Sequence, residues 1–190
     1  MKRFVALIAL SASFACTFAA QAGTLMTTAG PAFAPPAFSP FCAREPRLCS
    51  TSGGKKVVTL QPELSAELKQ VNRAVNSRIK ERNDTGDDWR VPVTSGDCED
   101  FAILKKRELL KRGWPASALL LTVARYRGQG HTVLTVRTNE GDLILDNLTS
   151  SVRDWSSTPY NYFARQAQGN GRSWERIGGA KPILSTAVGG

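Results

Sequence analysis

The sequence is poor in the residues that most often bind transition metals. Its 190 residues include one histidine and four cysteines, and the cysteines lack the paired spacing of a zinc ribbon or finger. There is no internal repeat, and no stretch after the first 20 residues is apolar and long enough to span a bilayer. Hydrophobic residues make up 42% and charged residues 22%, which excludes a wholly disordered chain and a polytopic membrane protein. The length fits one soluble domain.

Acidic residues are fewer than basic ones. The chain has 16 Asp and Glu and 25 Lys and Arg, which gives a net charge of +9. A run of like charge is most often the solvated face of a helix, and we expect the densest basic segment of this chain to form such a face. Nucleic-acid binding would need interleaved aromatic residues or a known module, which the sequence does not contain. We therefore expect no nucleic-acid partner. The basic segment consists of Lys105, Lys106, Arg107, Lys111 and Arg112.

The N-terminus has the pattern of a secretory signal peptide. Lys2 and Arg3 precede an apolar stretch, and Ala20-Gln21-Ala22 matches an A-x-A cleavage site. We predict a signal peptide over residues 1–22, with a retained N-terminal anchor as the alternative. Cleavage would leave 168 residues with a net charge of +7. The mature protein would be exported or periplasmic, with no membrane span.

Signal cleavage removes Cys16 and leaves an odd number of cysteines. In an oxidising compartment one thiol then stays free or pairs between chains. Cys42 and Cys49 flank a short loop that contains a proline, and this spacing closes easily into a local disulfide. The remaining thiol is Cys98.

The pattern along the chain predicts an α+β fold. Residues 23–55 are rich in Pro and Ala and are expected to form a mostly irregular arm, held by the Cys42–Cys49 bridge. A folded domain over 56–178 then places helices before an antiparallel sheet, and 179–190 is expected to be a loose tail. The predicted elements are helices at 62–81 and from 98 to about 113, and strands at 119–126, 131–138 and 143–148.

The polar residues around Cys98 are not typical of a cysteine in a hydrophobic core. Asp97 is a favourable N-cap residue, and Asp100 follows where a capping-box carboxylate would lie. Cys98 would then occupy the first turn of a helix, where unpaired backbone N–H groups and the helix dipole favour a thiolate. The same N–H groups suit an oxyanion site. This pattern indicates a catalytic nucleophile, although a lone cysteine is more often a small core residue.

A nucleophilic cysteine needs a base and a group that orients the base. His131 provides the sole imidazole, and Asp146 lies on the following predicted strand. A two-residue turn at Glu140-Gly141 would place Asp146 opposite Thr135, four residues from His131 along the strand. Contact would then require a slipped register, a bulge or strong twist. The orienting carboxylate therefore remains open among Asp146, Asp142 and Asp154.

Five segments resemble the bacterial transglutaminase-like cysteine peptidases, a periplasmic branch of the transglutaminase/papain-like superfamily. The resemblance covers about residues 40 to 177, and the Cys, His and Asp blocks occur in the family's order. The cysteine pair Cys42 and Cys49 also looks like the family's N-terminal pair. The matching segments are Val71-Asn72-Arg73-Ala74-Val75-Asn76, Asp88-Trp89 with Pro92, Gly96-Asp97-Cys98-Glu99-Asp100-Phe101-Ala102, Gly130-His131-Thr132-Val133-Leu134 and Leu143-Ile144-Leu145-Asp146-Asn147-Leu148.

This resemblance implies a papain-like α+β fold with Cys98 as nucleophile, His131 as general acid/base and Asp146 as orienting carboxylate. Relatives in the family are calcium-dependent proteases that cut large cell-surface adhesins and so release biofilm cells. In them the acidic residues that flank the cysteine bind calcium, which here would be Asp97 and Glu99. The chemistry itself requires no cofactor.

The predicted function is an exported cysteine peptidase whose partner is a protein substrate, with a cell-surface adhesin as the candidate. The same machinery could instead act on glutamine as a transglutaminase or deamidase. A non-catalytic periplasmic binding module is the alternative from another class. For Asp97 and Glu99, calcium binding competes with simple helix capping.

Overall fold

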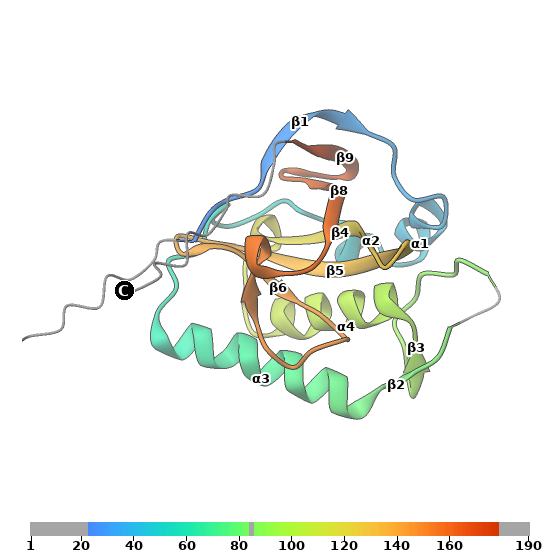
Figure 1. Cartoon of the computed structure of the whole chain (residues 1–190), viewed down its shortest axis with the longest axis horizontal. Coiled ribbons are helices and arrows are strands. Elements are labelled where there is room, and N and C mark those ends of the chain that lie inside the picture. Colours follow the sequence, from blue (N-terminus) through green and yellow to red (C-terminus); the bar gives the residue numbers. More distant parts are fainter. Residues whose placement is uncertain (1–22, 84–85, 179–190) are drawn as a thin grey trace, which may run out of the picture.

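The computed structural model of the protein describes residues 23–83 and 86–178. The predicted signal peptide (1–22) and tail (179–190) lie outside these residues. Within them, a seven-stranded antiparallel sheet has the order β1-β9-β8-β4-β5-β6-β7 (Figure 1). Its strands are β1 (Thr27–Ala32), β4 (Leu119–Tyr126), β5 (Gln129–Thr138), β6 (Gly141–Leu145), β7 (Arg153–Asp154), β8 (Asn161–Ala167) and β9 (Asn170–Gly178).

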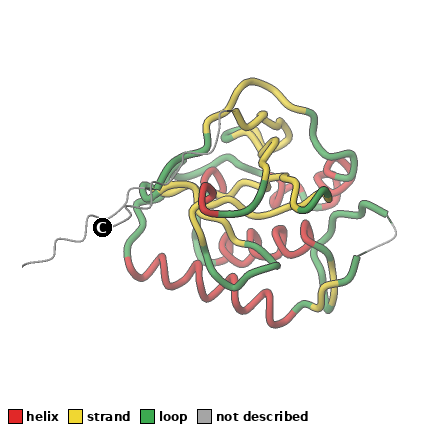
Figure 2. The backbone as a smooth tube through the Cα atoms, in the orientation of Figure 1, coloured by secondary structure: helices red, strands yellow, loops and turns green. Residues whose placement is uncertain are grey.

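Two long helices, α3 (Pro62–Arg78) and α4 (Cys98–Lys111), lie on the same side of the central strands. They occupy the lower part of Figure 2, with most strands above them. Among the described residues, no helix combines the length and apolarity needed to cross a bilayer. The predicted α+β class is confirmed. The smaller elements are α1 (Phe38–Arg44), α2 (Pro46–Cys49), the 3₁₀ turns η1 (Ala116–Ala118) and η2 (Trp155–Ser157), and a parallel pair of β2 (Lys80–Glu81) with β3 (Ser95–Gly96).

The apolar stripe of α3 packs as its period predicts. Pro62 opens the helix, and Leu68, Val71 and Val75 are buried on one face. The helix ends at Arg78, three residues before the predicted end. The reason is that Lys80–Glu81 pairs with β3 instead of continuing the helix.

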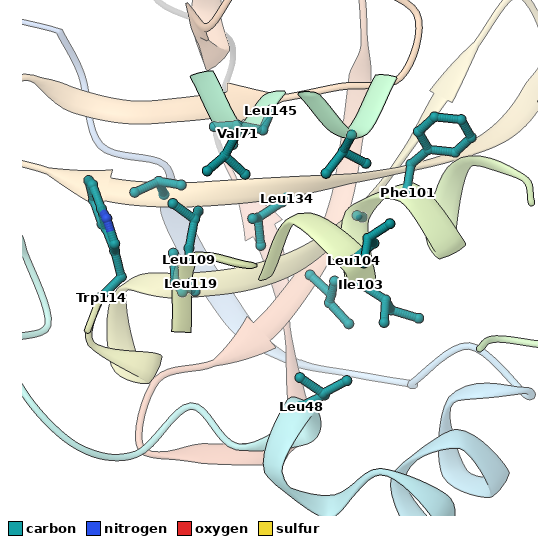
Figure 3. Close-up of a cluster of buried hydrophobic side chains, with 14 of the residues drawn as sticks. Leu48, Val71, Phe101, Ile103, Leu104, Leu109, Trp114, Leu119, Leu134 and Leu145 are labelled. Atoms are coloured by element: carbon teal, nitrogen blue, oxygen red, sulfur yellow. The ribbon is translucent and has the colours of Figure 1, made fainter. Parts of the chain in front are cut away.

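The main core lies between these helices and the sheet. Leu104 of α4, Leu134 of β5 and Leu145 of β6 are fully buried in it. Figure 3 shows side chains from α3, α4 and the strands meeting there. The opposite face of the sheet carries a smaller cluster that includes Val133 and Ile144. Adjacent residues of β5 and of β6 thus point to opposite faces, as the strand period requires.

The N-terminal segment 23–55 is more ordered than its composition predicts. It contains β1, which pairs with edge strand β9, and the short helices α1 and α2. Phe38 and Phe41 are buried and pack against Trp89, and Cys42 and Cys49 form the expected disulfide. Burial of these aromatic side chains outweighs the weak local propensity of a Pro- and Ala-rich segment.

The expectation of a solvated basic face on α4 is wrong for two of its lysines. Lys105 and Lys106 are fully buried. The Lys106 ammonium donates to Gln166 Oε1 at 3.0 Å, and the Lys105 ammonium lies 5.7 Å from the Phe101 ring centre. Burial lowers the pKa of each lysine from 10.5 to about 7. Sequence alone did not reveal this because α4 is covered on more than one side.

These two lysines should make the protein more stable as the pH rises from 7 to 8.5. Their pKa values are lower in the folded chain, so between these pH values the unfolded chain binds more protons. The free energy of unfolding therefore increases with pH. We expect a gain of about 1–2 kcal/mol per lysine, relative to a Lys105→Met/Lys106→Met variant. Denaturant unfolding at both pH values measures the difference. Lys111→Met, on the exposed side of α4, is the control. Its free energy of unfolding should change with pH as that of the wild type does.

Candidate active site

Cys98 is the first residue of α4 and lies within the polar segment Gly96-Asp97-Cys98-Glu99-Asp100. Asp97 has extended backbone geometry at the N-cap position, as predicted, but its side chain makes no capping hydrogen bond to the described residues. Asp100 Oδ1 accepts a hydrogen bond from the Arg90 amide at 2.9 Å. A Cβ on Gly96 would lie 2.4 Å from Asp100 Oδ2, so glycine lets this tight turn into the helix form.

Cys98 lies directly beside strand β5. The backbone N–H of Thr132 donates to Cys98 Sγ at 3.3 Å. His131, the preceding residue, is buried and lines the same two cavities as Cys98. The contact between residues 34 positions apart therefore places the thiol next to the imidazole-bearing strand.

His131 and Asp146 are in direct contact. His131 Nε2 and Asp146 Oδ1 are 2.9 Å apart, and both side chains are buried. A carboxylate can only accept, so Nε2 carries the proton of this hydrogen bond. In the neutral imidazole, Nδ1 is then the nitrogen with a free lone pair for use as a base.

The strand register explains this contact and corrects the predicted one. The β5–β6 turn is at Asn139-Glu140, one position earlier than expected, and Leu145 pairs with Leu134. Asp146, one residue past β6, is therefore level with Val133 and not with Thr135. The separation from His131 falls from four residues to two, which side chains on one face can bridge.

The backbone around Asp146 is fixed by two asparagines of α3. Asn72 Oδ1 accepts from the Asp146 N–H at 3.2 Å, and Asn76 Nδ2 donates to the Asp146 carbonyl at 2.9 Å. Both amides also donate to the carbonyl of Thr149. The loop after β6 is thereby attached to the helix below the sheet.

The two alternative carboxylates make other contacts. Asp142 bonds the Met26 N–H and forms ion pairs with Arg137 and Arg165. Asp154 caps η2 by accepting from the Ser156 N–H at 2.9 Å. Of the three carboxylates, the structure places Asp146 against His131.

Two cavities meet at Cys98 and His131. One, of about 380 Å³, has a largely apolar wall, and the other, of about 270 Å³, has polar and apolar surface in about equal parts. A larger hollow of about 580 Å³ near α2 and the far end of α4 is lined by neither cysteine nor histidine. The apolar wall of the first includes Phe33, Trp89, Val123 and Phe163, and the polar side chains of the second include Asn83, Arg127, Gln129 and Asn147.

The model of one protein family, described as bacterial transglutaminase-like cysteine proteinase, matches residues 28–182. The chain belongs to this family. It is a cysteine peptidase with a transglutaminase-like fold. A search of curated proteins found no match.

Solved structures of LapG from Legionella pneumophila are similar to this peptidase. The calcium-bound form is 24% identical, with a TM-score of 0.54 over 83% of this chain and 88% of that one. A second LapG structure is 27% identical, with a TM-score of 0.50 over 71% and 78% of the two chains. An EGTA-treated form is also 27% identical, with a TM-score of 0.50 over 71% and 76%. These similarities support the assignment of the fold.

The charge around Cys98 disfavours a resting thiolate. Burial, followed by the negative charge of Glu99, raises the pKa of the Cys98 thiol above its usual value. The thiol lies 3.2 Å from Glu99 Oε2. Burial and then a hydrogen bond with the Asp97 carboxyl raise the pKa of Glu99 to about 8. The expected stabilisation of a thiolate by the helix N-terminus is therefore outweighed in the peptidase by desolvation and nearby acids.

Sequence reasoning missed one residue of the site, Tyr160. Its hydroxyl donates to Asp146 Oδ2, and its ring lies 4.9 Å from that of His131. It follows the 3₁₀ turn in a segment without a clear period, so no local pattern indicated a role. Asn72 and Asn76 did lie in a segment that resembled the family, but their contact with Asp146 was not foreseen.

Proposed function

We propose that this peptidase is exported and cleaves a protein substrate through a thioester formed on Cys98, with His131 and Asp146 completing the triad. The contact of Cys98 Sγ with the Thr132 N–H carries the proposal, because it places the thiol next to a histidine that is bound to a carboxylate. Residues 1–22 would act as the cleavable export signal. The oxidising compartment agrees with the Cys42–Cys49 disulfide.

In the first half of the reaction, Cys98 Sγ attacks the carbonyl carbon of the scissile peptide bond. The raised pKa of Cys98 means that its proton must be removed, and His131 Nδ1 accepts it. The oxyanion that forms is held by backbone N–H groups near Cys98, at the start of α4. His131 then gives the proton to the leaving amine, the C–N bond breaks, and a thioester remains.

In the second half, His131 accepts a proton from water, and the resulting hydroxide attacks the thioester carbonyl. The C–S bond breaks, Cys98 recovers its proton from His131, and the carboxylic acid product leaves. Asp146 keeps His131 in the Nε2–H tautomer. It also stabilises the imidazolium that His131 forms between the two proton transfers.

The two cavities lined by Cys98 support an extended protein substrate. One offers apolar contacts and the other hydrogen-bonding groups, which fits a peptide segment bound across the thiol. Because relatives of the family cut cell-surface adhesins, we propose an adhesin as the substrate.

Co-expression of the exported protein with candidate surface proteins tests this function. We expect site-specific cleavage, with a new N-terminus detected by mass spectrometry. Conversion of a glutamine side chain to glutamate, with release of ammonia and no chain cleavage, would instead identify a deamidase, and cross-linked products would identify a transglutaminase. Either result would contradict the proposed proteolysis.

We also propose that calcium binds at Asp97 and Glu99. The two carboxyl groups lie close enough to share a hydrogen bond, and the buried Asp97 Oδ1 has no partner among the described residues. Carboxylate oxygens suit this ion, and its charge would offset the acids that raise the pKa of Cys98. Among the described residues there is no group of three or more acidic, His or Cys side chains suited to a metal. Further ligands would therefore be backbone carbonyls or water.

A chelator should reduce both the activity and the thermal stability of the peptidase. A ligand that binds only the folded state stabilises it by about 2.7 kcal/mol at a concentration one hundred times its Kd. Calorimetry with calcium and with EGTA measures the shift, and the cleavage assay measures activity. The expected loss is several degrees in Tm together with slower turnover.

The double variant Asp97→Asn/Glu99→Gln should abolish this calcium response. A matched control, Glu63→Gln/Glu140→Gln, removes the same charge from exposed positions and should keep it. If EGTA changes neither the Tm nor the activity of the wild type, the two carboxylates have only a structural role at the start of α4. The calcium proposal is then wrong.

A further inference from the structure

Tyr160 lies on the face of the sheet opposite α4, in the small cluster that contains Val133 and Ile144. It is only 4% exposed, so its hydroxyl needs a partner inside the protein. That partner is Asp146 Oδ2.

The two oxygens of Asp146 have different partners. Oδ1 lies 2.9 Å from His131 Nε2 and 3.2 Å from the Leu148 N–H. Oδ2 accepts from Tyr160. Because Asp146 is 2% exposed, solvent cannot easily replace the tyrosine as donor. Rotation of the carboxylate away from His131 would therefore cost both hydrogen bonds at once.

The ring of Tyr160 also touches the imidazole. The ring centres of Tyr160 and His131 are 4.9 Å apart at an interplanar angle of 54°. Tyr126 packs edge-on against Tyr160 at 5.3 Å, and Tyr162 does so at 6.1 Å. The aromatic cluster thus limits the orientations open to both Tyr160 and His131.

We propose that Tyr160 is a positioning residue for the His131–Asp146 pair. Its hydroxyl holds the Asp146 carboxylate with Oδ1 facing His131 Nε2, and its ring fixes the plane of the imidazole. Its effect on turnover depends on the proposed triad, whereas its effect on the tautomer of His131 does not.

The surrounding charges keep Tyr160 in the donor state. Burial and then the Asp146 carboxylate raise the pKa of Tyr160 above its usual value. Burial alone would raise the pKa of Asp146, but hydrogen bonds from His131 and Tyr160 lower it. Lys105, on α4, is a further charged group that acts on Asp146. A neutral phenol beside an anionic carboxylate is the arrangement the proposal requires.

The test compares Tyr160→Phe with Tyr162→Phe in full-length mature protein without a histidine tag. Tyr160→Phe keeps the ring and removes the bond to Asp146, while Tyr162→Phe removes a neighbouring hydroxyl that bonds Thr158. The chain has one histidine, so ¹⁵N NMR of the imidazole reports on His131 without assignment. The wild type should show the Nε2–H tautomer.

We expect Tyr160→Phe to give a mixture of tautomers and Tyr162→Phe to match the wild type. In the cleavage assay, Tyr160→Phe should lower kcat about ten- to one-hundred-fold with little change in KM. This decrease is the size expected for the loss of one hydrogen bond to a charged group. An unchanged tautomer in Tyr160→Phe would overturn the proposal, even if the protein melts earlier. A wild-type imidazole that is not Nε2–H would overturn it without any variant. A shifted tautomer in a protein with no protease activity would leave the positioning role intact and refute the proposed function.

Discussion

Replacement of Cys98 by alanine should reduce peptide-bond cleavage by more than about 10⁴-fold, since no thioester can form without the thiol. Cys98 is the only free cysteine among the described residues, so no nearby thiol can replace it. The fold should persist, because alanine is the best helix former and Cys98 is half-buried at the first position of α4. Cleavage of the co-expressed surface protein and far-UV circular dichroism measure the two effects.

Iodoacetamide labelling provides the matched control for this variant. The wild-type mature protein should take up one label at Cys98, and Cys98→Ala should take up none, while Cys42 and Cys49 stay oxidised. An active Cys98→Ala protein would refute the whole mechanism. So would an active wild type in which Cys98 is part of a disulfide.

Asp146→Asn should lower turnover by about 10²–10⁴-fold, as the loss of the orienting carboxylate does in other triads. Asparagine nearly preserves the shape of the side chain but removes the charge that stabilises the imidazolium. Its amide could also present a donor to Nε2 and so favour the wrong tautomer of His131. Steady-state kinetics and thermal unfolding of the purified variant separate the loss in kcat from any loss in stability.

Asp142→Asn is the control for Asp146→Asn, because Asp142 is also a buried aspartate of the same hairpin. Its ion pairs with Arg137 and Arg165 are structural, so the variant should lose stability more than kcat. Asp154→Asn should have little effect on kcat. If Asp154→Asn were the damaging change and Asp146→Asn harmless, the assignment of the orienting carboxylate would be wrong.

Periodic and local features were predictable from the sequence. The stripe that includes Leu68, Val71 and Val75 predicted the buried face of α3, and β4 has the predicted bounds Leu119–Tyr126. The start of α4 at Cys98 followed from the polar residues before it. These features depend on contacts within one turn or along one strand, so a short window of sequence contains most of the information.

Features that depend on long-range packing were predicted less well. The segment 23–55 joins the sheet and the core because β9 and Trp89 lie next to it, which its Pro- and Ala-rich composition does not show. The charge pattern of Lys105 and Lys106 indicated a solvated face, yet neighbouring elements cover both side chains.

The sequence by itself determined the order and kinds of residues in the candidate site, with Cys98 at a helix start, His131 on a strand and Asp146 on the next predicted strand, which in the structure ends one residue before it. Only the tertiary structure decided that the hairpin register brings Asp146 to His131, that α3 fixes the loop of Asp146, and that Tyr160 holds its second oxygen. A turn one residue earlier shifts the pairing by two positions, and no local propensity distinguishes the two turns strongly. Leu134 and Leu145 face the core in either register, because a two-position shift preserves the alternation of side chains, so the apolar pattern does not distinguish them. In the observed register the backbone of Asp146 bonds Asn72 and Asn76 of α3, which are contacts between separate elements.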